Sequence, residues 1–177
     1  MDAAQRREEI QRTLQESSAP VSAGSFAKKL GVSRQVIVGD VALLRAANVP
    51  ISATPRGYVM QGDAGRRGLI RTIACCHDKE GIAQEMYAVV DNGCGMLDVI
   101  VEHAVYGQIS GQLHAFSRYD VDCFVKNLAR SESLPLCNLT GGVHLHTIVC
   151  PDEDAYRRVL EQLKEKGFLF EKDPPKE

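Results

Sequence analysis

The chain has 177 residues, with 21 lysines and arginines against 23 aspartates and glutamates, and 44% of its residues are hydrophobic. This composition excludes a disordered or fibrous chain and suits a globular protein with a buried core. The sequence contains no run of about 18 apolar residues and starts with charged side chains, so we expect neither a membrane span nor an export signal, and we expect a cytoplasmic location.

Charge is distributed unevenly along the chain. Residues 1–67 carry ten basic and six acidic side chains, a balance of +4, which leaves −6 for the remainder. All five histidines and all six cysteines lie in that second part, and we expect the cysteines to be reduced thiols. The asymmetry predicts two domains with different partners, at residues 1–62 and 69–173, joined by a Gly-rich linker at residues 63–68.

The basic part predicts a winged helix-turn-helix. Apolar spacing indicates three helices, one at residues 3–15, one ending at Gly31 and one capped by Ser33. A short turn with a glycine between two helices is typical of the helix-turn-helix. Two extended runs around a Pro-Arg-Gly turn then predict a hairpin at residues 51–60, which is the wing.

Five side chains of this part are candidates for DNA contacts. Glutamine can bond an adenine edge, and arginine can bond guanine or phosphate. A single basic residue more often belongs to a solvated surface, but the ordered set of helix, turn, helix and basic wing favours DNA binding for the segment. The candidates are Lys28, Arg34, Gln35, Arg45 and, at the tip of the wing, Arg56.

One residue disagrees with a regular third helix. Gly39 lies inside it, where glycine costs about 1 kcal/mol relative to alanine. We interpret Gly39 as permitting close approach of the backbone to DNA.

The acidic part predicts strands that alternate with helices. Apolar runs rich in valine and isoleucine indicate the strands, and helical spacing of apolar residues indicates the helices. The alternation predicts an α/β sandwich, so the fold class of the whole chain is α+β. The predicted strands are residues 69–76, 96–105, 143–149 and 168–170. One predicted helix follows Asp78, and two others span residues 118–130 and 152–166.

The strongest chemical signal is the pair His144 and His146, because alternate residues on a strand point to the same face of a sheet. His77, at the end of the first strand, and Glu85, about two turns along the next helix, complete a set of three imidazoles and a carboxylate. Such ligands suit Zn²⁺, Ni²⁺, Co²⁺ or Fe²⁺, and not Ca²⁺ or Mg²⁺. The spacing leaves open a metal-free alternative, two hydrogen-bonded and partly buried histidines.

The remaining chemistry-bearing residues give weaker signals. His103 is a candidate donor to a metal ligand or a pocket residue, and His114 suits a structural or surface role. Without a CxxC pair a zinc knuckle is not expected, and four cysteines are interpreted as small core residues. The sequence contains no nucleophile elbow, no P-loop and no fingerprint of a dinucleotide-binding site, so we do not expect an enzyme. The four core cysteines are Cys94, Cys123, Cys137 and Cys150.

Two groups of residues resemble a known family. Residues 32–38, 43–46 and 53–58 resemble the biotin-repressor-type winged helix. Residues 101–107 and 139–148, with the string Thr-Gly-Gly-Val-His-Leu-His-Thr, resemble the three-histidine domain. Together they resemble the niacin-responsive repressors of NAD biosynthesis.

The resemblance implies a homodimeric repressor that binds operator DNA when nicotinic acid is present and holds one transition metal ion per chain. Its metal ligands correspond to His77, Glu85, His144 and His146, the four that spacing suggests. Effector-binding candidates are His103, Tyr106 and Arg71, and we expect the nicotinate carboxylate to complete the metal coordination while its ring packs on Tyr106.

Two alternatives belong to other functional classes. Three histidines and a carboxylate with an open position also suit a metalloenzyme that activates water or O₂. A third hypothesis is a repressor whose signal is the metal itself. The sequence alone leaves the choice among nicotinic acid, nicotinamide and related pyridines open.

Overall fold

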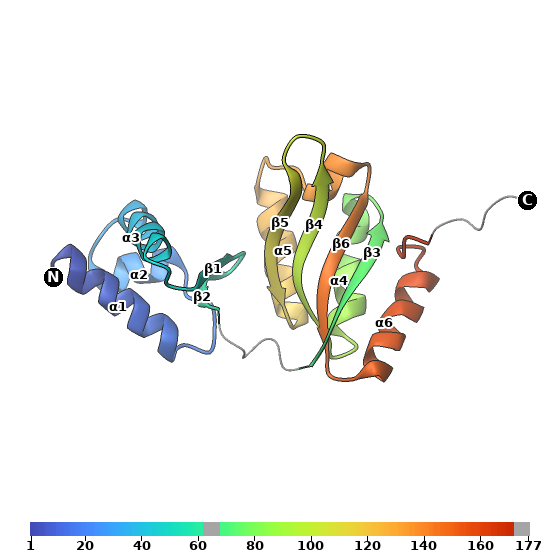
Figure 1. Ribbon diagram of the computed structural model, residues 1–177, viewed down its shortest axis with the longest axis horizontal. Coiled ribbons are helices and arrows are strands. Elements are labelled where there is room, and N and C mark those ends of the chain that lie inside the picture. The colour runs from blue at the N-terminus through green and yellow to red at the C-terminus, as the bar shows by residue number, and fades with distance from the viewer. Residues whose placement is uncertain (62–67, 172–177) are drawn as a thin grey trace, which may run out of the picture. The chain divides into compact units, whose positions relative to one another are not determined.

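The computed structural model describes residues 1–61 and 68–171 (Figure 1). The chain divides into two compact units, Met1–Gly62 and Asp63–Glu177, which are termed the N-terminal and the C-terminal unit. The predicted linker at residues 63–68 lies outside the described residues except for Gly68, and so does the predicted end at residue 173. Across the described ranges, the structure contains no helix of the length and apolarity that a membrane span requires.

The N-terminal unit consists of three helices and a hairpin. Ser22 and Ser33 cap the second and third helices, since each side chain accepts a hydrogen bond from a backbone amide in the first turn. Gly31 closes the second helix in the left-handed conformation, with φ of 66°. The elements are α1 (Ala3–Glu16), α2 (Ala23–Leu30), α3 (Arg34–Ala46), β1 (Ile51–Thr54) and β2 (Gly57–Met60), and β1 pairs antiparallel with β2.

The core of this unit lies where α1, α2 and α3 meet. Phe26, Ile10 and Ile37 are almost completely buried there. Burial of these apolar side chains supplies the main stabilisation of so small a unit. The prediction of a winged helix-turn-helix is confirmed, with α2, a three-residue turn and α3 as its centre.

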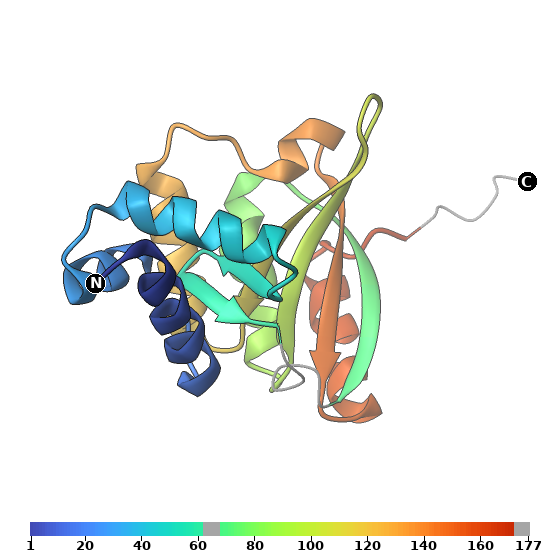
Figure 2. The same ribbon diagram turned by 60° about the vertical axis from the view of Figure 1, so that its left-hand side comes forward.

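The C-terminal unit is built on a four-stranded sheet with strand order β3-β6-β4-β5, and every pairing is antiparallel. Three helices, α4, α5 and α6, contribute to one continuous apolar core against the sheet. Figures 1 and 2 show α4 and α5 on the same side of the sheet. The elements are β3 (Leu69–Cys76), η2 (Lys79–Gly81), α4 (Ile82–Val90), β4 (Gly95–His103), β5 (Gly107–Ala115), α5 (Arg118–Arg130), η3 (Leu136–Thr140), β6 (Val143–Cys150) and α6 (Glu153–Glu165).

The predicted α+β class is confirmed, but three details of the C-terminal unit were predicted wrongly. Strand β5 was not expected, because Gly107–Ala115 contains glycines, glutamines and a serine. The expected strand at residues 168–170 makes only an isolated bridge, between Leu169 and Cys75. Cys123, expected in the core, is only half-buried, because it lies two residues after the buried Val121 on α5 and therefore about 200° around the helix from it.

Candidate functional site

Three imidazoles meet one carboxylate inside the C-terminal unit. The Nε2 atom of His77 lies 2.7 Å from Oε2 of Glu85, and Nε2 of His146 lies 3.2 Å from the same oxygen. Nε2 of His144 lies 3.3 Å from both carboxylate oxygens. Glu85 is only 1% exposed, so its charge must be compensated within the cluster and not by bulk water.

The sequence positions these side chains through two strands and a helix. His144 and His146 alternate on β6 and point to the face that the helices cover. β3 pairs with β6 through Cys76 and Val143, which places the next residue, His77, beside the same end of β6. Glu85 lies in the first turn of α4, and not two turns along a helix as expected, because the separate 3-10 helix η2 precedes α4. The structure therefore brings together the four residues that spacing had suggested.

Each imidazole also contacts a backbone carbonyl through Nδ1. The partners are the carbonyl oxygens of Asp78 for His77 at 2.7 Å, of Gly142 for His144 at 2.7 Å, and of Asp98 for His146 at 2.6 Å. Since a carbonyl oxygen can only accept, Nδ1 carries the hydrogen in each ring. In the neutral imidazole, Nε2 then presents a bare lone pair to the Glu85 carboxylate.

This arrangement requires positive charge at its centre. Three lone pairs that face a carboxylate repel it unless protons or a metal cation lie between them. Histidine ligands of metals characteristically donate their second N–H to a carbonyl or carboxylate, as these three do. His77, Glu85 and His144 offer ligand atoms that all lie within 4.8 Å of one another, so this group could hold a metal ion. Nitrogen and oxygen donors of this kind suit Zn²⁺, Ni²⁺, Co²⁺ or Fe²⁺.

The pKa values of Glu85, His77 and His146 reflect the attraction between the carboxylate and protonated imidazoles. Burial alone raises the pKa of Glu85, but the charge of His146 and hydrogen bonds from all three imidazoles hold that pKa well below its ordinary value. Burial lowers the pKa of His77 and of His146, but the Glu85 carboxylate, together with Asp78 beside His77 and Asp98 beside His146, outweighs burial, so both pKa values are raised. Without a metal, protons therefore bind these imidazoles more tightly than they bind free histidine.

Backbone features hold the rings in place. A Cβ atom at Gly81 would lie 2.7 Å from Nδ1 of His77, and one at Gly142 would lie 2.8 Å from the carbonyl oxygen of His77, so both positions need glycine. A β-bulge between Met96 and Asp98 shifts the register of β4 and lets the Asp98 carbonyl meet His146.

Cys75 is a neighbour of the cluster that the sequence had not singled out. It lies opposite His144 in the β3–β6 register, on the same face of the sheet, and it is fully buried. Burial, together with the charge of Glu85 and a hydrogen bond to it, raises the pKa of the Cys75 thiol. Cys75 therefore contributes a neutral S–H group beside the carboxylate. The signal that could have found it is its even spacing from Ile73 on the buried face.

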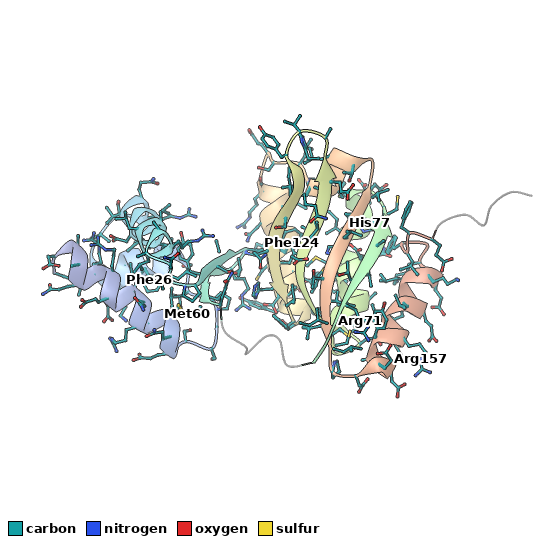
Figure 3. The ribbon with its side chains drawn as sticks, in the orientation of Figure 1. Phe26, Met60, Arg71, His77, Phe124 and Arg157 are labelled. Carbon is teal, nitrogen blue, oxygen red and sulfur yellow. The ribbon has the colours of Figure 1, made fainter. Side chains whose placement is uncertain are left out.

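Two of the three candidate effector residues, His103 and Tyr106, contact each other, and Arg71 lies apart from them. His103 ends β4, its Nδ1 accepts hydrogen bonds from the amides of Val105 and Tyr106, and its ring lies 5.0 Å from that of Tyr106. Tyr106 is 76% exposed. Arg71 pairs with Glu153 of α6, and Figure 3 shows it toward the opposite end of β3 from His77. The structure does not bring Arg71 to the histidine cluster.

The candidate DNA contacts lie on three elements of the N-terminal unit. Lys28 on α2, and Arg34, Gln35 and Arg45 on α3, are exposed, whereas Arg56 in the turn between β1 and β2 is half-buried. Exposed polar side chains at the start of the second helix of a helix-turn-helix are placed to contact base edges.

A helix-turn-helix with a wing in one unit and a buried three-histidine cluster in the other define a two-domain transcription regulator. A family model of an HTH domain matches residues 6–59, and one of the 3H domain matches residues 70–172. The chain is 47% identical over 167 residues to the probable transcription repressor NiaR of Thermotoga maritima, and 41% identical over 169 residues to the transcription repressor NadR of Bacillus subtilis. Each match covers 94% of both chains.

The chain belongs to the NiaR/NadR family of transcription repressors with HTH and 3H domains. Both relatives carry the name of a transcription repressor and not of an enzyme, which agrees with the expectation drawn from the missing catalytic signatures.

Proposed function

We propose that this chain is a cytoplasmic, homodimeric repressor of NAD-biosynthesis or niacin-uptake genes, with nicotinic acid as corepressor and a transition metal held by His77, Glu85, His144 and His146. The observation that carries the proposal is the convergence of three Nε2 atoms on one buried carboxylate in a chain that also holds a helix-turn-helix. The identity of the effector rests on the resemblance to niacin-responsive repressors.

The donor set supports the metal in this proposal. All three imidazoles are fixed through Nδ1, which leaves their Nε2 atoms available as ligands. A bound transition metal supplies a Lewis-acidic position at which an anionic carboxylate is favoured. This chemistry favours nicotinic acid over nicotinamide, which lacks the negative charge.

Operator binding rests on the N-terminal unit. Lys28, Arg34, Gln35, Arg45 and Arg56 supply the phosphate and base contacts in this proposal. Corepression requires only that nicotinic acid bind the DNA-competent arrangement of the dimer better than other arrangements, by about 1–3 kcal/mol.

The test is fluorescence anisotropy of the metal-loaded protein on labelled duplexes from upstream of its own gene and of niacin-related genes, at one fixed salt concentration. We expect saturable binding that tightens about 5- to 150-fold with nicotinic acid. Nicotinamide and chelator-treated protein are the controls and should give no tightening. Binding that follows metal content but ignores nicotinic acid would instead identify the metal as the signal.

Three variants test the site itself. His144→Ala, His146→Ala and Glu85→Ala each remove one donor, so metal content measured by mass spectrometry and the response to nicotinic acid should fall together. A Lys164→Ala variant is a matched control, because Lys164 lies in the same unit on α6, is exposed and pairs with Glu171. Full metal content in all three donor variants would exclude the assigned site.

A further inference from the structure

The surface of α3 that faces away from the core carries unusually small side chains. Ile37, Val41 and Leu44 point inward and are buried. Residues four, seven and eleven positions apart share one face of a helix, so the opposite face carries Gln35 and then three small residues. These are Gly39, Ala42 and Ala46, all exposed.

The fold does not require a glycine at position 39. A Cβ atom added there would meet nothing within 4 Å, and Gly39 is not among the residues with positive φ. Glycine nevertheless weakens the interior of a helix relative to alanine. Since packing within the unit does not explain this glycine, we attribute it to a binding partner whose surface must approach the backbone of the helix closely.

The middle of α3 also lacks polar side chains that could read bases. Between Gln35 and Arg45 only Asp40 is polar, and it is buried against Arg6 through contacts of 2.6 and 3.3 Å. The exposed side chains of this stretch are apolar, and the larger ones are Val36, Val38 and Leu43. Val38 and Leu43 lie nearest the small face, one on each side of it. Among the major-groove groups, the thymine methyl is the one that an apolar side chain recognises.

We propose that Gly39 is the position at which the backbone of α3 comes closest to the floor of the major groove, and that Val38 and Leu43 beside it contact thymine methyl groups of the operator. This inference rests on the proposed function, since it requires specific DNA binding by α3. It predicts thymines at the operator positions that face the middle of α3, between the bases that Gln35 and Arg45 reach.

The first test compares Gly39→Ala and Gly39→Leu with a Gln15→Leu control on α1, using a duplex that the wild-type protein selects from a random-sequence pool. Gly39→Ala should raise Tm by about 2–6 °C, because alanine favours the helix, and yet should weaken binding. Gly39→Leu should weaken binding at least about tenfold, because leucine holds the helix away from the groove. Gln15→Leu should stay within about twofold.

The second test replaces thymine with deoxyuridine, one position at a time, in the selected half-site. Removal of a contacted methyl group should weaken binding about fourfold, as expected for one buried methyl group. The double variant V38S/L43S, in which both exposed residues become polar, should bind more weakly and respond less than about twofold to the same replacements.

The outcomes separate this inference from the proposed function. Suppose that the wild-type protein selects a duplex, but Gly39→Leu binds it with unchanged affinity or no deoxyuridine replacement weakens binding of the wild-type protein. Either result would overturn the close approach of α3 to the groove floor and leave the proposed repressor function intact. Wild-type protein that selects no duplex would overturn both. Circular dichroism and metal content of each variant establish that the chain is folded.

Discussion

Glu85 is the residue on which the histidine cluster depends most, because all three Nε2 atoms face its carboxylate. The carboxylate is buried and cannot be solvated, so it must be neutralised from within the cluster. Protons on the imidazoles and a metal ion can both do this, but not at the same Nε2 atoms. Proton binding and metal binding therefore compete, which gives the site a defined pH dependence.

Metal affinity should decrease as pH falls, and the decrease should begin above pH 6.5. The ordinary histidine pKa is 6.5, and Glu85 raises the pKa of both His77 and His146 in the metal-free protein. Both imidazoles are neutral above these raised pKa values and become protonated below them, so one or two protons must leave for each metal ion bound. Affinity should then fall about 10- to 100-fold per pH unit below pH 6. Competition with a fluorescent chelator between pH 5 and 8 measures this; constant affinity across that range would contradict the assigned ligands.

Gly81 should matter for the metal although it offers no ligand. Its φ of −76° is ordinary for any residue, so the close contact of an added Cβ with the His77 ring, 2.7 Å, is what excludes a side chain. Gly81→Ala should displace the ring and weaken metal binding about 10- to 100-fold, as for other groups that orient a ligand. Isothermal titration of metal into the variant tests this, with Gly39→Ala in the other unit as the glycine-to-alanine control. Equal affinity in both variants would contradict the steric role of Gly81.

The four candidate ligands could be predicted from the sequence, but the groups that orient them could not. His144 and His146 follow the two-residue period of a strand, and His77 ends an apolar run. The hydrogen bond between His146 and the Asp98 carbonyl, in contrast, lies at a β-bulge, and residue types do not predict where a β-bulge occurs. Since every residue has a carbonyl, the sequence also does not indicate which one meets the imidazole.

At the scale of elements, the sequence predicted the helices and the edge strand β3, but not the other edge strand, β5. Capping serines and apolar spacing placed α2 and α3, since a helix that buries one face repeats that face every three or four residues. Strand β5 lies at the opposite edge of the sheet from β3, so the edge position alone does not explain why β5 was missed. Its buried residues, Leu113 and Ala115, are too few to stand out among polar neighbours.

α1 is attached to α3 by a buried ion pair. Nε of Arg6 lies 2.6 Å from Asp40, which is 4% exposed, and Arg7 approaches the same carboxylate at 3.5 Å. Asp40 thus fixes the helix that carries the candidate base contacts while remaining unavailable to DNA.

Asp40→Ala should lower the free energy of unfolding of the N-terminal unit by about 1–3 kcal/mol, because it leaves two arginines without their buried acceptor. Hydrogen exchange of α1 peptides, followed by mass spectrometry in the full chain, reports on this unit separately. Glu16→Ala is the matched control: the Arg12–Glu16 pair is exposed on both sides and should contribute less than about 0.5 kcal/mol. Similar exchange in the two variants would mean that the buried pair does not hold α1 in place.

At the scale of the whole molecule, the two units carry opposite charge. The basic excess lies with the helix-turn-helix, whereas the remainder of the chain is acidic and repels phosphate. The histidine cluster and the candidate DNA contacts therefore belong to separate compact units. In the proposed mechanism, an effector bound in one unit acts on the other through the arrangement of the dimer. Such coupling is strongest when operator binding requires both recognition helices at once.

If the repressor binds as a dimer, its operator should contain two half-sites about 34–36 Å apart, which is one turn of DNA, or a multiple of that distance. Inserting five base pairs between the half-sites should turn one of them to the opposite side of the duplex. One recognition helix then loses its site, and affinity should fall at least about 100-fold, which corresponds to about 3 kcal/mol. Anisotropy titrations at fixed salt, with nicotinic acid and metal present, measure the loss, and a duplex with one scrambled half-site gives the reference for single-site binding. Equal affinity for the original and the expanded operators would show that each chain binds DNA independently, and would remove the dimer from the proposed mechanism.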